Sequence, residues 1–274
     1  MLSLIHLTSM EQSLKAQYKN ASNISARIRL HKEYSQNKQG WFPWIYEQLP
    51  IGTSMKPLHI LELGCGNGAL WTENLNQLPS DISITLSDIS DGMIRDIHRN
   101  IGEDSRFHYA ICDCHHLPYE DNSYNIVIAN HLLFYCEDIH QVCHEVHRVL
   151  TSDGTFYCST YGKQHMCEIT ELVQGFDSHI NLSSEALYNK FGLENGSNYL
   201  SEHFSHIELR HYEDHILINQ PEPLIEYILS CHGNQNQILL NRFADFRDYV
   251  TIQTQKGFHI SKDAGIFICK NENK

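Results

Sequence analysis

The sequence lacks any long apolar segment. No window reaches the ~18 consecutive apolar residues that a membrane-spanning helix requires, so no membrane span is expected. The apolar start at residues 2–7 is too short for a secretory signal peptide, and it lacks the basic flank of one. These absences predict a protein of the cytoplasm.

Paired cysteine spacings and basic runs are also missing. The 9 cysteines show no C-x-x-C spacing, which in a chain without an export signal favours reduced thiols over a disulfide framework. Lys and Arg total 20 against 33 Asp and Glu, so the formal net charge is -13, and no long basic run interrupts this balance. Because neutralising many phosphates requires clustered cations, nucleic acid is a disfavoured partner and a small molecule is favoured.

What the sequence does contain is a regular alternation of strands and helices from residue 57 onward. Apolar runs at 58–63, 82–86, 106–112, 124–129 and 155–160 predict strands. Helices are expected at 69–78, 90–100 and 138–149, the second capped by Ser90 and the third by Asp138, with a turn at 151–154. Strands that alternate with helices in this way indicate right-handed βαβ units and a parallel sheet.

The later part of the chain follows a looser pattern. Helices are expected at 165–176, at 183–190 and within 223–250, and strands at 206–212 and 265–270. Two late strands suit a sheet whose edge ends in an antiparallel pair. We therefore predict an α/β fold over residues 57–274: a Rossmann-like, mostly parallel seven-stranded sheet with helices on both faces. A helical cap at about 214–262 is inserted between the last two strands, and residues 1–56 form an N-terminal helical lid segment.

The first expected strand ends in a glycine-rich turn, Gly64-Cys65-Gly66-Asn67-Gly68, that leads directly into a helix. Glycine lets the backbone turn sharply and approach a ligand without a Cβ in the way, and the helix start offers unpaired N–H groups. With Ala69, the turn also satisfies the G-x-G-x-x-A fingerprint of dinucleotide-binding proteins, and Asp88 lies about where their ribose-binding acid would be. The turn alone leaves two cofactor classes open.

Three further motifs follow the turn in order. They are Asp88-Ile89-Ser90-Asp91-Gly92-Met93 after the second strand, Cys112-Asp113-Cys114-His115-His116-Leu117-Pro118-Tyr119 after the third, and Ser123-Tyr124-Asn125-Ile126-Val127 leading to Asn130-His131 at the fourth. With Glu62 before the glycines, residues 58–160 closely resemble class I S-adenosylmethionine-dependent methyltransferases, particularly the small-molecule group that includes the ubiquinone and menaquinone biosynthesis methyltransferases. This family often has Phe-Asp where the chain has Tyr124-Asn125. A dinucleotide enzyme explains the turn and its acid but not the last two motifs.

The resemblance implies S-adenosylmethionine as the cofactor and gives roles to the first two motifs. Gly64 and Gly66 would lie against its methionine part, where backbone carbonyls can receive the ammonium group, and Glu62 would orient the loop. Asp88 would accept both ribose hydroxyls, because two adjacent hydroxyls need an acceptor with two oxygens.

The adenine ring would contact the residues that follow the second and third strands. The resemblance implies that Ile89 packs on the adenine face, that Asp113 accepts from the amino group, and that the N–H of Cys114 reaches a ring nitrogen. Further cofactor contacts are expected from Cys65, Asn67, Gly68, Met93 and Asn130.

The sequence indicates the methyl acceptor less clearly than the cofactor, because the cofactor carries its own electrophile and positioning supplies much of the rate of methyl transfer. His131, at the carboxyl end of the fourth strand, is the candidate general base, with a substrate-wall role as the alternative. Aromatic rings that suit a flat or cationic acceptor give the candidate pocket: Tyr34, Trp41, Trp44, Tyr135, Tyr161 and His165. Trp41 and Trp44 could instead anchor a helix on the sheet.

The predicted function is methyl transfer to O, N or C of a small molecule. A methyltransferase acting on RNA or protein, or a catalytically idle cofactor-binding protein, are the alternatives. The sequence also holds two groups of potential metal ligands: Cys112, Cys114, His115 and His116, and His140, His144 and His147 on one helical face. The first group brackets Asp113 and the second lies opposite an apolar helix face, so no metal is expected.

Overall fold

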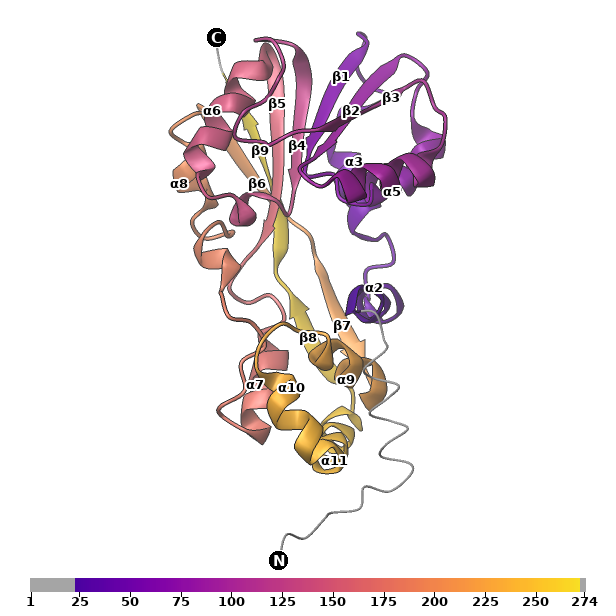
Figure 1. Cartoon of the computed structure of the whole chain (residues 1–274), viewed down its shortest axis with the longest axis vertical. Helices are drawn as coiled ribbons and strands as arrows, with labels where there is room; N and C mark the ends of the chain where they lie inside the picture. Colours follow the sequence, from indigo (N-terminus) through magenta and orange to yellow (C-terminus); the bar gives the residue numbers. More distant parts are fainter. Residues whose placement is uncertain (1–22, 272–274) are drawn as a thin grey trace, which may run out of the picture. The chain divides into compact units, whose positions relative to one another are not determined.

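The computed structural model describes residues 23–271, which fall into two units (Figure 1). We call residues 39–163, 187–213 and 263–271 the sheet unit, and residues 23–38, 164–186 and 214–262 the cap unit. Among residues 23–271, no helix is both long and apolar enough to cross a membrane.

A seven-stranded sheet runs through the sheet unit in the order β3-β2-β1-β4-β5-β9-β6. Its strands are β1 (Leu58–Leu63), β2 (Ile82–Asp88), β3 (Phe107–Ile111), β4 (Tyr124–Asn130), β5 (Leu150–Tyr161), β6 (His206–His211) and β9 (Ala264–Lys270). The first five strands pair parallel, whereas β9 runs antiparallel to both β5 and β6. The prediction of a Rossmann-like, mostly parallel sheet with an antiparallel edge is confirmed.

Helices cover both faces of this sheet, because side chains of its strands alternate between two cores. Leu61 of β1 packs into one core with Val142 and Val146 of α6 (Ile139–Val149). Ile60 packs into the other core, with Ile97 of α5. That second core is covered by α3 (Trp41–Gln48), α4 (Ala69–Thr72) and α5 (Asp91–Ile101), and α8 (Gly196–Leu200) completes the unit. Apolar strands buried on both faces are typical of parallel sheets.

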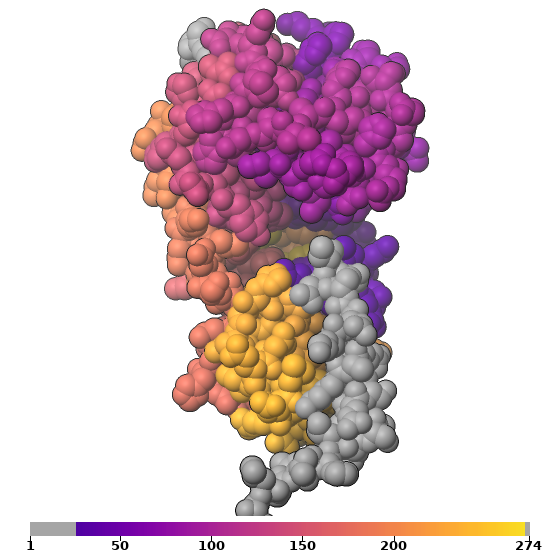
Figure 2. Space-filling model, viewed as in Figure 1, coloured from indigo at the N-terminus to yellow at the C-terminus, as the bar shows by residue number. Residues whose placement is uncertain are grey.

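The cap unit is mainly helical and has a core of its own. Its helices are α2 (Asn23–Tyr34), α7 (Cys167–Phe176), α9 (Pro221–Leu229), α10 (Gln235–Leu239) and α11 (Phe243–Thr254). Strands β7 (Asp214–Ile218) and β8 (Phe258–Lys262) pair antiparallel. Leu30, Ile216, Ile225 and Phe246 are buried together, so the helices and the β7–β8 pair share one core. The surface of the carboxyl-terminal helices is the gold region of Figure 2.

The division into units differs from the predicted segments at two places. Residues 39–56 belong to the sheet unit, where Ile45 and Tyr46 of α3 are buried in the sheet's core, rather than to one N-terminal segment with residues 23–38. Residues 164–186 join 214–262 in the cap unit, because Ile169 and Val173 of α7 pack into its core.

Three local predictions were wrong. The helix expected at 69–78 stops at Thr72, and a 3₁₀ turn follows at Leu75–Gln77, where buried Asn74 donates its side-chain amide to the carbonyl of Leu70. The turn expected at 151–154 is part of β5, which extends back to Leu150 opposite Tyr124. The helix expected at 183–190 is only a 3₁₀ turn at Leu187–Asn189.

Candidate active site

A cavity of about 320 Å³ opens at the carboxyl ends of β1, β2 and β4. The strand order reverses between β1 and β4, and ligands of doubly wound folds bind at such a switch point. The lining residues follow strand ends: Gly64, Ser87, Asp88, Ile89, Cys112, Asp113, Cys114, His115, His131, Leu132, Tyr135 and Cys136.

The glycine turn after β1 adopts a backbone that other residues rarely adopt. Gly64, Gly66 and Gly68 have φ of +59, +54 and +74°, all in the left-handed region. A Cβ on Gly64 would lie 2.6 Å from the Leu132 Cδ1 atom, and one on Gly68 would overlap the Ile97 side chain. The left-handed backbone therefore favours glycine at all three positions, and the lack of space for a Cβ favours it further at Gly64 and Gly68. The main chain itself borders the cavity at Gly64.

Glu62 is a buried acid at the end of β1, with 2% of its surface exposed. Its Oε2 accepts from Trp71 Nε1 at 2.6 Å and its Oε1 accepts from Asn130 Nδ2 at 3.2 Å. Burial raises the pKa of Glu62 to about 7, and these two donors oppose that shift. Asn130 also accepts from Ser159 Oγ at 3.1 Å, so β1, β4 and β5 are joined through one polar network.

Asp88 connects the glycine turn to the start of α5. Its Oδ2 accepts from the N–H of Gly66 at 3.1 Å, and its Oδ1 accepts from the N–H of Ser90 at 2.8 Å. A carboxylate oxygen can accept more than one hydrogen bond, so both oxygens keep capacity for a pair of hydroxyls. Next to it, Ile89 is 72% exposed at the cavity, an apolar side chain placed to pack on a flat ligand.

The remaining residues expected around the turn lie close by. Cys65 is buried and its N–H donates to the carbonyl of Ser87 at 2.9 Å. Asn67 accepts from the N–H of Ala69 at 3.2 Å, which closes the turn into α4. Met93 is 39% exposed in the first turn of α5, where Ser90 Oγ accepts its N–H.

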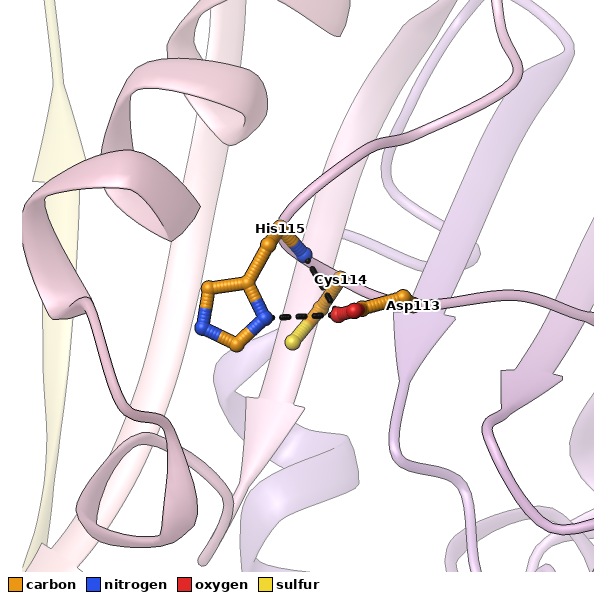
Figure 3. Close-up of side chains that lie close together, drawn as sticks. All are labelled: Asp113, Cys114 and His115. Carbon is orange, nitrogen blue, oxygen red and sulfur yellow. Dashed lines mark hydrogen bonds and ion pairs between the residues drawn. The ribbon is translucent and has the colours of Figure 1, made fainter.

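Asp113 is held by the histidine two residues later (Figure 3). Its Oδ1 accepts from the N–H of His115 at 2.9 Å and contacts His115 Nδ1 at 2.6 Å. These contacts lower the pKa of Asp113, so the carboxylate stays charged. On the other side of the ring, the N–H of Asp138 donates to His115 Nε2 at 3.4 Å. His115, considered from the sequence only as a metal ligand, is the residue that orients Asp113.

Two sulfur atoms border the cavity beside Asp113. Cys114 Sγ lies 3.7 Å from Cys136 Sγ, and both residues line the cavity. Cys136 and Leu132 were not singled out from the sequence. Leu132 lies two residues after the end of β4, and this position could have indicated it, because residues there face the switch point. Cys136 follows only after the 3₁₀ turn Leu133–Tyr135, and no local sequence signal marks it.

His131 follows β4 with an unusual backbone, φ +48°, in the left-handed region. Its N–H donates to Ser159 Oγ at 3.0 Å, and its ring stacks on Trp41 with centroids 5.0 Å apart. Trp41 in turn contacts Trp44 at 5.4 Å and the edge of Tyr212 at 5.3 Å.

The predicted acceptor residues fall into two groups. Trp41 and Tyr161 both contact the His131 ring, the latter with centroids 6.3 Å apart, and Tyr135 lines the cavity with 67% of its surface exposed. Tyr34 and His165 belong to the cap unit, where the Tyr34 hydroxyl donates to Gln220 Oε1 at 3.3 Å, so their part in an acceptor pocket stays a prediction. Tyr212, which packs on both tryptophans, was missed from the sequence.

Comparison with known proteins places the middle of the chain in a family. Residues 61–158 match the family model described as a methyltransferase domain. A malonyl-[acyl-carrier protein] O-methyltransferase of Geobacter sulfurreducens is 31% identical over 114 residues, which are 42% of this chain and 42% of that protein. The enzyme of the same name from Hahella chejuensis is 31% identical over 136 residues, 47% of each chain. The chain spans about half the length of the curated relatives it matches.

Solved structures show the same fold at low identity. The phosphoethanolamine N-methyltransferase 2 of Haemonchus contortus, in complex with phosphomonomethylethanolamine and S-adenosylhomocysteine, has a TM-score of 0.54 at 16% identity, covering 97% of this chain and 60% of that one. The [4+2]-cyclase SpnF has a TM-score of 0.54 at 14% identity, covering 95% of this chain and 97% of that one. The family match, the strand order and the position of the cavity together show that the chain carries a methyltransferase domain of the class I S-adenosylmethionine-dependent type.

Proposed function

We propose that this chain transfers a methyl group from S-adenosylmethionine to O, N or C of a small molecule. The observation that carries the proposal is the cavity at the switch point of a methyltransferase domain, lined by the glycine turn and by two carboxylates, Asp88 and Asp113. Curated relatives named as O-methyltransferases support the same reaction class.

The cavity residues suit the cofactor group by group. Asp88 would accept the two ribose hydroxyls with its remaining lone pairs, since the N–H groups of Gly66 and Ser90 already fix its orientation. Asp113, held charged by His115, would accept from the adenine amino group, and exposed Ile89 would pack on the ring. The Gly64 main chain would lie against the methionine part, because it borders the cavity and carries no side chain of its own.

The acceptor would lie against His131 and exposed Tyr135, which line the cavity, with the ring of His131 stacked on Trp41. The bound cofactor supplies a sulfonium methyl, and the chain's task is to hold the acceptor atom in line with it. Aromatic faces suit a flat or cationic acceptor. His131 is the candidate base, because its left-handed backbone is fixed by Ser159 and its side chain borders the cavity. The net charge of -13 supports a small acceptor over nucleic acid. A cytoplasmic location is likewise proposed from the composition of the sequence alone.

Cofactor binding is tested by calorimetry with S-adenosylmethionine and S-adenosylhomocysteine. Asp88→Ala should weaken both at least about 100-fold, because two hydrogen bonds to a charged acceptor are lost. Asp96→Ala removes an equal charge from the exposed face of α5 and should bind like the unmodified protein. If the unmodified protein binds neither compound, the proposal is wrong.

Methyl transfer needs its own test, since a [4+2]-cyclase shares this fold. The protein is incubated with methyl-labelled cofactor and a cell extract, and labelled products are separated by size. Label in a small molecule is expected. Label in RNA or protein would favour a macromolecule methyltransferase, and cofactor binding without any label would favour an idle binding protein. On the identified acceptor, unchanged turnover by His131→Ala would remove the base assignment and leave a wall role.

A further inference from the structure

Imidazole and carboxylate side chains gather on α6 and the turn that follows α8, outside the cavity residues. His140, Glu202 and His203 each offer one ligand atom, and the three atoms lie within 4.8 Å of one another. His140 Nδ1 and Glu202 Oε2 lie 3.2 Å apart. The rings of His140 and His203 have centroids 6.0 Å apart. A small rotation of partly exposed side chains would bring such atoms around one ion.

The backbone that carries these side chains is fixed by its neighbours. Glu202 and His203 lie between Leu200 and Phe204, both buried in the core that α6 also covers. The N–H groups of His203 and Phe204 both donate to the carbonyl of Leu200, at 3.0 and 2.9 Å. The turn therefore holds its two polar side chains against α6 before any ligand binds.

His203 has a buried polar atom that the described residues leave unsatisfied. Its Nε2 is buried and makes no hydrogen bond within residues 23–271. A buried nitrogen without a partner costs stability, and a cation would offset that cost.

The donor set selects the class of cation. Neutral imidazoles with one carboxylate suit Zn²⁺, whereas Ca²⁺ and Mg²⁺ take oxygen ligands. His144 lies one helical turn after His140 on α6, at i+4; its side chain is 64% exposed and its Nδ1 lies 3.8 Å from Glu145 Oε1, a contact that it would exchange for the ion. His147, the third histidine of this helix face, instead packs on Phe204.

We propose that His140, Glu202 and His203, with His144 as the fourth ligand, bind a zinc ion that joins α6 to the turn after α8. Four protein ligands leave no open position, which is the arrangement of a structural rather than a catalytic zinc site. The inference does not depend on the proposed methyl transfer.

The test is Zn²⁺ calorimetry on the full chain without a polyhistidine tag, with a chelator in competition. One saturable ion per chain is expected, and at 100 times Kd the Tm should rise by about 5 °C. His140→Ala and His203→Ala should each weaken binding at least about 100-fold, and His144→Ala less. His206→Ala, which removes an exposed histidine of β6, should change nothing and controls for the 19 histidines of the chain.

Substituting Co²⁺ adds a readout that identifies the ligands. Cobalt held by these residues should give a visible spectrum without a thiolate charge-transfer band. A thiolate band that disappears in Cys114→Ser would place the ion at Asp113, Cys114 and His115 instead, and would overturn the proposal. The proposal is equally wrong if no saturable binding occurs, or if a folded variant with both His140→Ala and His203→Ala binds as tightly as the unmodified chain.

Discussion

Buried carboxylates serve different purposes in the two units of the chain. In the sheet unit, Glu62 is buried with two neutral N–H donors at the end of β1, next to a turn that borders the cavity. In the cap unit, Asp214 is buried with the ammonium group of Lys262 at 2.6 Å, where the first residue of β7 pairs with the last residue of β8. The side-chain donors to Glu62 are therefore uncharged, whereas the charge of Asp214 is paired with that of Lys262.

This difference separates groups that support a ligand site from groups that hold the chain together. Asp214 also accepts from Ser35 Oγ at 2.8 Å and from the N–H of Asn37 at 2.9 Å, so the segment after α2 and the β7–β8 pair meet at one carboxylate. At the strand ends of the sheet unit, Asp88 keeps lone pairs for a ligand. We therefore expect changes in the cap unit to alter stability and changes at the strand ends to alter cofactor affinity.

The largest effect should come from Asp214→Ala. Removing this carboxylate takes away the charge that pairs with Lys262, whose side chain is 10% exposed and also donates to Ser35 Oγ, and breaking a buried ion pair on one side costs about 3–5 kcal/mol. Urea unfolding followed by circular dichroism measures the loss, with the two units allowed separate transitions. Asp248→Ala, an exposed acid of α11, is the matched control.

The same variant tests the separation itself. Folded Asp214→Ala should bind S-adenosylhomocysteine within about twofold of the unmodified protein, since it removes nothing from the cavity. A matching loss of cofactor affinity would show that the two kinds of carboxylate are not independent.

Burial alone would raise the pKa of Asp214, but Lys262 and the other donors lower it, so its contribution to stability is lost as pH falls.

Glu62 should make stability depend on pH in the opposite direction. Its pKa is raised from 4.5 to about 7, so the folded chain binds the proton more tightly than the unfolded chain. The stabilisation is fully present below pH 4.5 and is lost as pH rises through about 7, by about 3 kcal/mol. Denaturation curves between these limits, compared with Glu62→Gln, measure it. The difference between the two proteins cancels the shared titration of histidines, and an unchanged pH slope in Glu62→Gln would show that this acid is not its source.

The sequence indicated the sheet better than the cap for a physical reason. Residues 58–160 alternate apolar runs with capping residues, and Ser90 and Asp138 do accept the N–H groups of Met93 and Gln141 as helix caps. The β7–β8 strand pair was missed because the two strands lie far apart in the chain and mix charged with apolar residues. Pairing of that kind follows from tertiary contacts rather than from local pattern.

The same limit applies to the candidate site. Asp88 and Asp113 could be placed from the sequence because both follow strand ends, where the topology brings side chains to one edge. Tyr212 could not, since only the packed fold brings it beside Trp41. The hydrogen bonds of Glu62 to Trp71 and Asn130 likewise form only where β1, α4 and β4 pack together, so no single sequence motif predicts them.

The smallest effect should distinguish two helix caps in the sheet unit. Ser90→Ala and Asp138→Ala each remove one side-chain acceptor from a helix start, so each should cost about 1 kcal/mol in urea unfolding. Ser90→Ala keeps the main-chain N–H that Asp88 Oδ1 accepts at 2.8 Å, but it loosens the start of α5 that carries this N–H, so it should also weaken cofactor binding, by about threefold. Asp138→Ala likewise keeps the main-chain N–H that His115 Nε2 accepts, and because that contact is longer, at 3.4 Å, its effect on affinity should be smaller. Equal losses of affinity in the two variants would mean that helix stability, not the orientation of Asp88, controls the cavity.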